Sequence, residues 1–178
     1  MRILNLRSSN KKRLRGAKAE CSRMVKGIRD LAKAFPSEDS EGCGYYHAHL
    51  PVAQSLIDSK NTSRSIRKLC IQTLIDAARD LEKIKPAFGV TTRIVVAIDF
   101  PNLWDSQLIV FYGQDYFDKF FCRNTKEQEW TVLPSERDIK REWGLEIPKQ
   151  FSVRGYKEEI LDEDYSHVGE VWFIGEVL

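Results

Sequence analysis

The sequence predicts an α+β protein, with a mostly antiparallel sheet of about four to six strands and two longer amphipathic helices packed on one face. In the first half of the chain, residues 12–85, apolar side chains recur mainly at helical spacing. From residue 90 to 178 the pattern changes to short β-branched runs and to the alternation that is typical of strands. One domain of 178 residues is long enough to bury such a core.

The first predicted helix covers residues 12–35. Its apolar side chains fall three and four positions apart on one stripe, and they are Leu14, Ala17, Cys21, Met24, Ile28, Leu31 and Phe35. A stripe of this regularity is typical of a helix face that packs on a core. Pro36 and the polar residues after it end the helix.

The second predicted helix begins at Thr62 or Ser63, either of which can cap it, and ends before Pro86. It is more apolar than the first and is therefore expected to be the central helix. The chain between the two helices is predicted as a loop at 36–44 and an extended segment at 45–50. Residues 52–58 fit either a strand or one helical turn.

Residues 93–99 and 107–112 predict two buried strands. The link between them is too short for a helical crossover, so the pair is expected to form an antiparallel hairpin. Further elements are a short helix at 115–121, a strand at 130–133, a short helix from Ser135 with Asp138 in a capping box, and a last hairpin from 151–160 to 170–177.

Composition limits the class of protein. Hydrophobic residues make up 42% and charged residues 30% of the chain, which is near average for a globular protein. No apolar run has the length of a membrane span, and the N-terminus lacks the apolar stretch of a signal peptide, so a cytoplasmic protein without a membrane partner is expected. The four cysteines form no CxxC pair and are expected to be free thiols. Residues 1–10 are expected to form a flexible tail.

The net charge of +2 conceals an uneven distribution along the chain. Residues 1–35 carry eleven basic and two acidic side chains, whereas residues 91–178 carry ten basic and seventeen acidic ones. From Glu158 to the end there are seven acids and neither Lys nor Arg. Either the two halves neutralise each other, or one pole faces a partner of opposite charge.

A first candidate site is the group Cys43, His47 and His49. Residues i and i+2 share one face of a strand, so both imidazoles can meet one ion, with Cys43 looping back as a third ligand. Asp58 or His167 would be the fourth. Zinc or another divalent ion is the only cofactor that the sequence suggests. The alternative is a pair of unliganded histidines, because the paired ligand spacings of zinc motifs are missing.

A second candidate comprises the carboxylates Asp99, Asp105 and Asp115. The D-x-x-N-L pattern after a buried strand resembles the opening of metal-dependent nucleases of the NYN/PIN type, in which acids at strand ends hold a divalent ion that activates water. That fold continues with a helix and a parallel crossover, whereas here another strand follows almost at once. Asp99, Pro101 and Asn102 also suit a tight turn.

Nucleic-acid binding through the basic first helix is a further hypothesis, and its candidates are Arg15, Lys18, Arg29 and Lys33. No aromatic side chain lies between Leu4 and Ala34 to stack on bases, and no RRM, KH or zinc-finger signature occurs. A solvated basic face is the alternative. The chain also lacks GxxxxGK[ST], GxGxxG and GxSxG. No motif therefore assigns an enzyme activity, and the sequence leaves open whether the protein is an enzyme.

The favoured hypothesis is a non-enzymatic protein-binding module, such as an immunity protein that neutralises a cognate toxin. An acidic surface suits a basic protein partner by complementary charge. Candidate contacts are the acids of the last hairpin together with two tryptophans: Glu158, Glu159, Asp162, Glu163, Asp164, Trp104 and Trp172. Trp104 stands on a loop, where aromatic residues often anchor interfaces. The sequence does not give an oligomeric state.

Four segments carry a resemblance to a known family. They are residues 49–59, 70–76 (CIQTLID), 99–104 (DFPNLW) and 169–176 (GEVWFIGE). Together they resemble a family of small bacterial proteins known only as a domain of unknown function. The resemblance covers most of the chain and implies a soluble single-domain protein. It implies no activity and supplies no catalytic residues.

Overall fold

The structure is a computed structural model. It describes residues 15–16, 18–19, 22–24, 26–27, 30, 44–50, 57, 63–88, 91–112, 131–161 and 166–176. For Trp104, Glu158, Glu159 and His167 it describes the backbone only.

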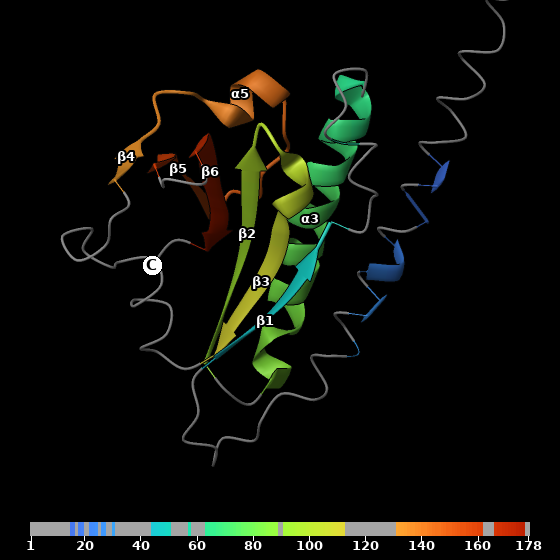
Figure 1. The fold of residues 1–178 in the computed structure, drawn as a ribbon. Coiled ribbons are helices and arrows are strands. Elements are labelled where there is room, and N and C mark those ends of the chain that lie inside the picture. Colours follow the sequence, from blue (N-terminus) through green and yellow to red (C-terminus); the bar gives the residue numbers. More distant parts are fainter. Residues whose placement is uncertain are drawn as a thin grey trace, which may run out of the picture.

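Six strands form one sheet in the described part of the chain. They are β1 (Gly44–His49), β2 (Thr92–Phe100), β3 (Gln107–Tyr112), β4 (Thr131–Pro134), β5 (Phe151–Leu161) and β6 (Ser166–Glu176). Their order is β1-β3-β2-β6-β5-β4, and every neighbouring pair is antiparallel (Figure 1). The predicted antiparallel sheet is confirmed.

Strands β2 and β3 form the hairpin that their short link predicts, with Thr92 opposite Tyr112 and Ala97 opposite Gln107. The link contains a short 3-10 helix, η3 (Leu103–Asp105). Ser106, which is buried, closes the turn. Its backbone N–H donates to the carbonyl of Leu103, and its hydroxyl oxygen accepts from the backbone N–H of Asp99. The short link of the predicted hairpin is therefore a hydrogen-bonded turn.

Strands β5 and β6 form a long hairpin of eleven residues each, in register from Phe151–Glu176 to Leu161–Ser166. On the other side of β6, strand β2 pairs only with residues 170–175. Residues 166–169 of β6 therefore extend beyond the end of β2 and pair with β5 alone. Val168, in this extension, is 70% exposed.

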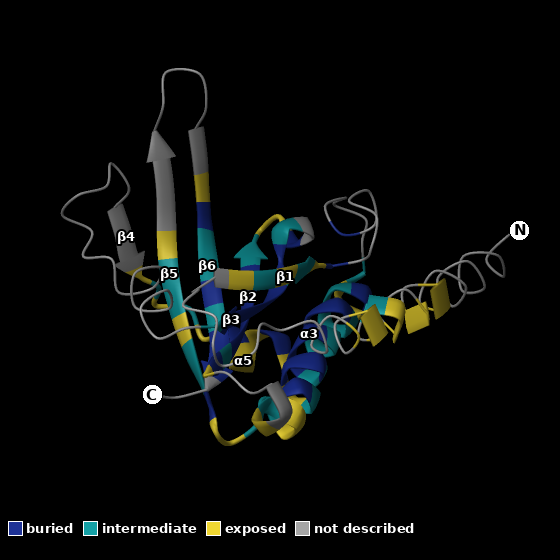
Figure 2. Cartoon of the chain, turned by 90° about the horizontal axis from the view of Figure 1, so that it is seen from below, coloured by how far each residue is buried: buried dark blue, intermediate teal, exposed yellow. Residues whose placement is uncertain are grey.

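The predicted central helix is α3 (Arg64–Ile84). Ser63 caps it, because the Ser63 side chain accepts from the backbone N–H of Ile66, and the 3-10 helix η2 (Lys85–Phe88) follows. Its buried residues are Ile66, Cys70, Ile71, Leu74, Ile75, Ala77, Ala78 and Leu81. They pack on sheet residues such as Ile94, Val96, Ile98 and Ile174, so one face of α3 is covered and the other faces solvent (Figure 2).

The prediction of two long helices on one face of the sheet is confirmed for α3 only. Within 12–35, the described residues are helical and exposed except for Met24, which is half-buried and packs against the main core. A second long helix packed on the sheet is not established by these residues. Of the ambiguous segment 52–58, the structure describes Ile57, which is helical and buried.

The short helix predicted from Ser135 begins later. Helix α5 (Ile139–Trp143) is capped by Asp138, whose carboxylate accepts from the backbone N–H of Arg141. Ser135 instead lies four residues before the helix, where its hydroxyl donates to Glu170 on β6 and accepts from the backbone N–H of Arg137. Gly144, at φ 60°, ends α5 in the left-handed conformation that glycine adopts without strain. The helix predicted at 115–121 lies outside the described residues.

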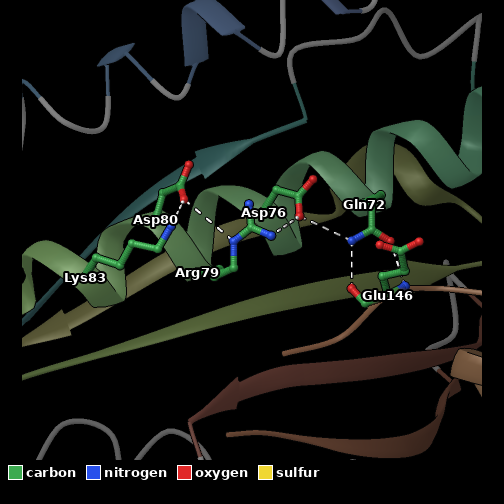
Figure 3. Close-up of polar contacts among 6 residues, drawn as sticks. All are labelled: Gln72, Asp76, Arg79, Asp80, Lys83 and Glu146. Carbon is green, nitrogen blue, oxygen red and sulfur yellow. Dashed lines mark hydrogen bonds and ion pairs between the residues drawn. The ribbon is translucent and has the colours of Figure 1, made fainter. Parts of the chain in front are cut away.

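The outer face of α3 is polar and is tied to the segment after α5 (Figure 3). The side-chain amide of Gln72 donates to the carbonyl of Glu146 over 2.7 Å and accepts from its N–H over 2.9 Å. Asp76, Arg79, Asp80 and Lys83 form exposed ion pairs along the same helix.

None of the described helices is both long and apolar enough to cross a membrane.

Candidate functional site

The first candidate site lies on β1, which is an edge strand that pairs with β3 alone. Tyr45, His47 and His49 alternate with inward residues and are exposed on one face of this strand. The His47 and His49 rings lie 4.9 Å apart between centroids, with their planes at 65°. The Tyr45 ring lies 5.5 Å from the His47 ring between centroids, with the two planes at 75°. The two imidazole rings therefore lie against each other on one face of β1.

A hydrogen bond orients His47. Its Nδ1 lies 2.8 Å from Oε1 of Gln107, the β3 residue directly opposite His49. The amide oxygen only accepts, so Nδ1 is the donor of this hydrogen bond, and Nε2 is the ring nitrogen that the bond does not use. In the described part of the chain no residue hydrogen-bonds to either Nε2 atom.

The other predicted ligands are not brought to this pair. Cys43 and Asp58 lie outside the described residues. His167 is on β6, which is separated from β1 by β2 and β3 in the sheet. Among the described residues, no group of three or more His, Cys, Asp and Glu side chains is placed to hold a metal ion.

The second set of candidates surrounds the β2–β3 turn. Asp99 stands near the end of β2, where its backbone is fixed by Ser106, and Asp105 is the last residue of η3. Asp115 lies outside the described residues. The next strand is antiparallel, so the parallel crossover of the nuclease fold is not present at this position. The turn residues Pro101 and Asn102 are both exposed.

A cluster centred on Glu170 is present that the sequence analysis did not identify. One carboxylate oxygen, Oε2, accepts from the Ser135 hydroxyl over 3.0 Å and from the indole N–H of Trp172 over 3.1 Å. The Nε atom of Arg137 lies 3.4 Å from the same oxygen. The Arg137 guanidinium also lies 4.4 Å from the centre of the Phe100 ring. The Glu170 side chain is only 15% exposed.

This cluster joins three parts of the chain. Phe100 and Glu170 are directly paired on β2 and β6, while Ser135 and Arg137 come from the segment between β4 and α5. A half-buried carboxylate with three donors on one oxygen is well satisfied. Its evident role is to fix the segment after β4 to the sheet.

Trp172, a predicted contact residue, is 4% exposed and belongs to the main core. Its ring lies over the backbone of Gly155, the residue opposite it on β5. In this position the side chain has almost no surface to offer a partner. It holds the β5–β6 hairpin to the core.

The remaining predicted contact residues are described in part. Glu158 and Glu159 are on β5, opposite Gly169 and Val168, in the extension of the hairpin beyond β2. Trp104 is in η3. The acidic turn 162–164 lies outside the described residues.

Of the residues predicted for nucleic-acid binding, Arg15 and Lys18 are exposed on helical backbone. Arg29 and Lys33 lie outside the described residues. Arg15 and Lys18 therefore remain exposed basic side chains. None of the described residues between 15 and 30 is aromatic.

Over the residues that the structure describes, fold and site define an α+β protein with one six-stranded antiparallel sheet, a core helix on one face and a histidine pair on an edge strand. The chain belongs to DUF3916, a family described as a protein of unknown function, whose match covers residues 25–176. This confirms the resemblance to a domain of unknown function. No curated protein and no solved structure matches the chain.

Proposed function

We propose that this protein is a non-enzymatic binding module that takes a basic protein partner on the acidic end of the β5–β6 hairpin. A cognate toxin that the chain neutralises, as an immunity protein does, fits this description. One observation supports the proposal above all. The hairpin extends beyond β2, and from Glu158 to the C-terminus the chain carries seven acids without a Lys or Arg.

The extension is suited to recognition because its backbone is paired before a partner arrives. Residues 158–161 pair with residues 166–169 of β6, and Thr131 and Val132 of β4 pair with the other side of β5. A surface that is already ordered loses little conformational entropy on binding. The acids on it raise the association rate with a basic partner and disfavour acidic ones.

An exposed apolar side chain lies within the same extension. Val168 is 70% exposed and stands directly opposite Glu159 on the neighbouring strand. Interfaces commonly combine an apolar centre with a charged rim. Val168 would supply the centre, and the acids at 158, 159 and 162–164 would supply the rim.

The experiment uses the full chain and the product of the gene next to it. Titration calorimetry at low and high salt measures the affinity, and cytochrome c serves as a generic basic protein. We expect a complex with the neighbouring product that weakens at high salt, since salt screens exposed charges. The complex should be much tighter than any with cytochrome c.

The variant for this test replaces the five acids by amides: Glu158→Gln, Glu159→Gln, Asp162→Asn, Glu163→Gln and Asp164→Asn. It should weaken the complex by at least about tenfold, because the charge complementarity is lost. A matched control, Asp76→Asn with Asp80→Asn on α3, should leave the affinity unchanged. The proposal fails if no salt-dependent complex forms. It also fails if the control variant weakens the complex as much as the variant with five substitutions does.

A further inference from the structure

We propose that His47 and His49 form a two-histidine chelate for a late first-row divalent metal ion, of which zinc is the representative. This inference is independent of the binding of a basic partner, because β1 and the β5–β6 hairpin lie on opposite sides of β2 in the sheet. Imidazole nitrogen is a preferred ligand of zinc, nickel, cobalt and copper ions.

The distance between the rings fits one shared ion. Two imidazoles that bind a tetrahedral zinc ion at Zn–N distances of about 2.1 Å have ring centroids about 5 Å apart. The observed centroid separation is 4.9 Å. Both rings come from one face of the same strand, two residues apart, so the strand itself places them side by side.

The hydrogen bond from His47 to Gln107 prepares the ring for a metal. A histidine that ligates through Nε2 usually donates its Nδ1–H to an oxygen acceptor, which fixes the ring and raises its basicity as a ligand. Gln107 Oε1 provides that acceptor at 2.8 Å. Gln107 is thus a positioning residue, and its position opposite His49 keeps it beside both rings.

Exposure determines the kind of site. Both histidines are exposed, and two protein ligands leave the remaining coordination positions to water. A site of this kind exchanges its ion with solvent and keeps open positions, which distinguishes it from a closed four-ligand structural site.

The test uses the full chain after removal of bound metal by a chelator and alkylation of accessible thiols. Cys70 is buried, and alkylation prevents the accessible cysteines from binding the ion. The protein is then titrated with Zn²⁺ by calorimetry and with Co²⁺ by absorption spectroscopy. We expect one ion per chain and cobalt ligand-field bands without a thiolate charge-transfer band.

Three variants and one control identify the ligands. His47→Ala and His49→Ala should each abolish the binding of one equivalent, because one imidazole alone does not form a chelate. Gln107→Leu should weaken binding by about tenfold to a hundredfold, as loss of an oxygen that orients a ligand does. His167→Ala, which removes the remaining histidine of the chain, should have no effect. Circular dichroism confirms that each variant is folded.

The proposal is overturned if the alkylated protein binds neither Zn²⁺ nor Co²⁺. It is also overturned if His47→Ala and His49→Ala bind as the parent protein does, or if His167→Ala loses the ion as they do. If the protein binds no zinc but still binds a basic partner, the metal site is refuted and the proposed function is unaffected. If it binds zinc but no basic partner, the proposed function is refuted and the metal site is unaffected.

Discussion

The indole ring of Trp172 lies directly on the backbone of Gly155, its cross-strand partner: a Cβ atom added to Gly155 would be 2.6 Å from Trp172 Cζ3. Glycine is therefore required here by space, since its φ is not positive. The contact lets a large aromatic side chain lie over β5 and belong to the same core cluster as the buried residues of α3.

Gly155→Ala should destabilise the protein by about 1–3 kcal/mol, because the added methyl group forces the buried ring of Trp172 to shift. Urea denaturation followed by tryptophan fluorescence measures the change. Gly27→Ala is the matched control, since a Cβ atom at this exposed helical glycine meets nothing within 4 Å. The control should be neutral or more stable by up to about 1 kcal/mol. Equal losses in both variants would contradict the packing argument.

Glu170→Ala should destabilise the protein by about 1–3 kcal/mol, because it leaves the buried indole N–H of Trp172 without its acceptor. Glu170→Gln keeps a carbonyl oxygen at the same place and should cause the smaller loss. The free energy of unfolding from urea titration tests the order of the two variants. Equal stability of Glu170→Ala and the parent protein would show that the cluster does not hold the segment after β4.

Local sequence patterns were sufficient for most of the fold. The β-branched run of β2, the length of the link to β3 and the N-cap of α3 at Thr62 or Ser63 are properties of neighbouring residues, and the sequence predicts each of them. The Glu170 cluster was missed because Ser135 and Glu170 are 35 positions apart in the sequence. The local pattern also predicts a helix start at Ser135, whereas in the structure Asp138 caps the helix and Ser135 contacts Glu170.

The histidine pair shows the same division between local and distant information. The period of two in a strand predicted that His47 and His49 share a face. Gln107 was not identified, because β1 and β3 are brought together across 60 positions of the chain, with α3 and β2 between them. Spacing along the sequence therefore indicated the histidine pair but not the glutamine that hydrogen-bonds to one of them.

Gln72→Ala should destabilise the protein by about 1–2 kcal/mol, because it removes the two hydrogen bonds from α3 to the backbone of Glu146 (Figure 3). Arg79→Ala is the control on the same helix. Its ion pair with Asp76 joins side chains that are 45% and 47% exposed, and such pairs contribute little. Thermal or urea unfolding compares the two, and a control as damaging as Gln72→Ala would refute the special role of the amide.

Gly144→Ala should destabilise the protein by about 1 kcal/mol, because a residue with a Cβ atom is strained at the φ of 60° that ends α5. Gly144→Asn should be less damaging, as asparagine adopts the left-handed conformation more readily. Space does not explain the effect, since an added Cβ would make only an ordinary contact of 3.5 Å with Lys68. Identical stability of the alanine and asparagine variants would argue against backbone strain as the cause.

Val168→Arg separates binding from folding in the proposed function. Val168 is 70% exposed, so the substitution should change the free energy of unfolding by no more than about 0.5 kcal/mol. It also removes the apolar contact and places a positive charge among acids that would face a basic partner, which should weaken the complex by about tenfold or more. Tyr45→Arg on the far edge strand is the control and should leave the affinity unchanged. Calorimetry with the neighbouring gene product gives the affinities, and a complex as tight with Val168→Arg as with the parent would exclude this part of the hairpin from the interface.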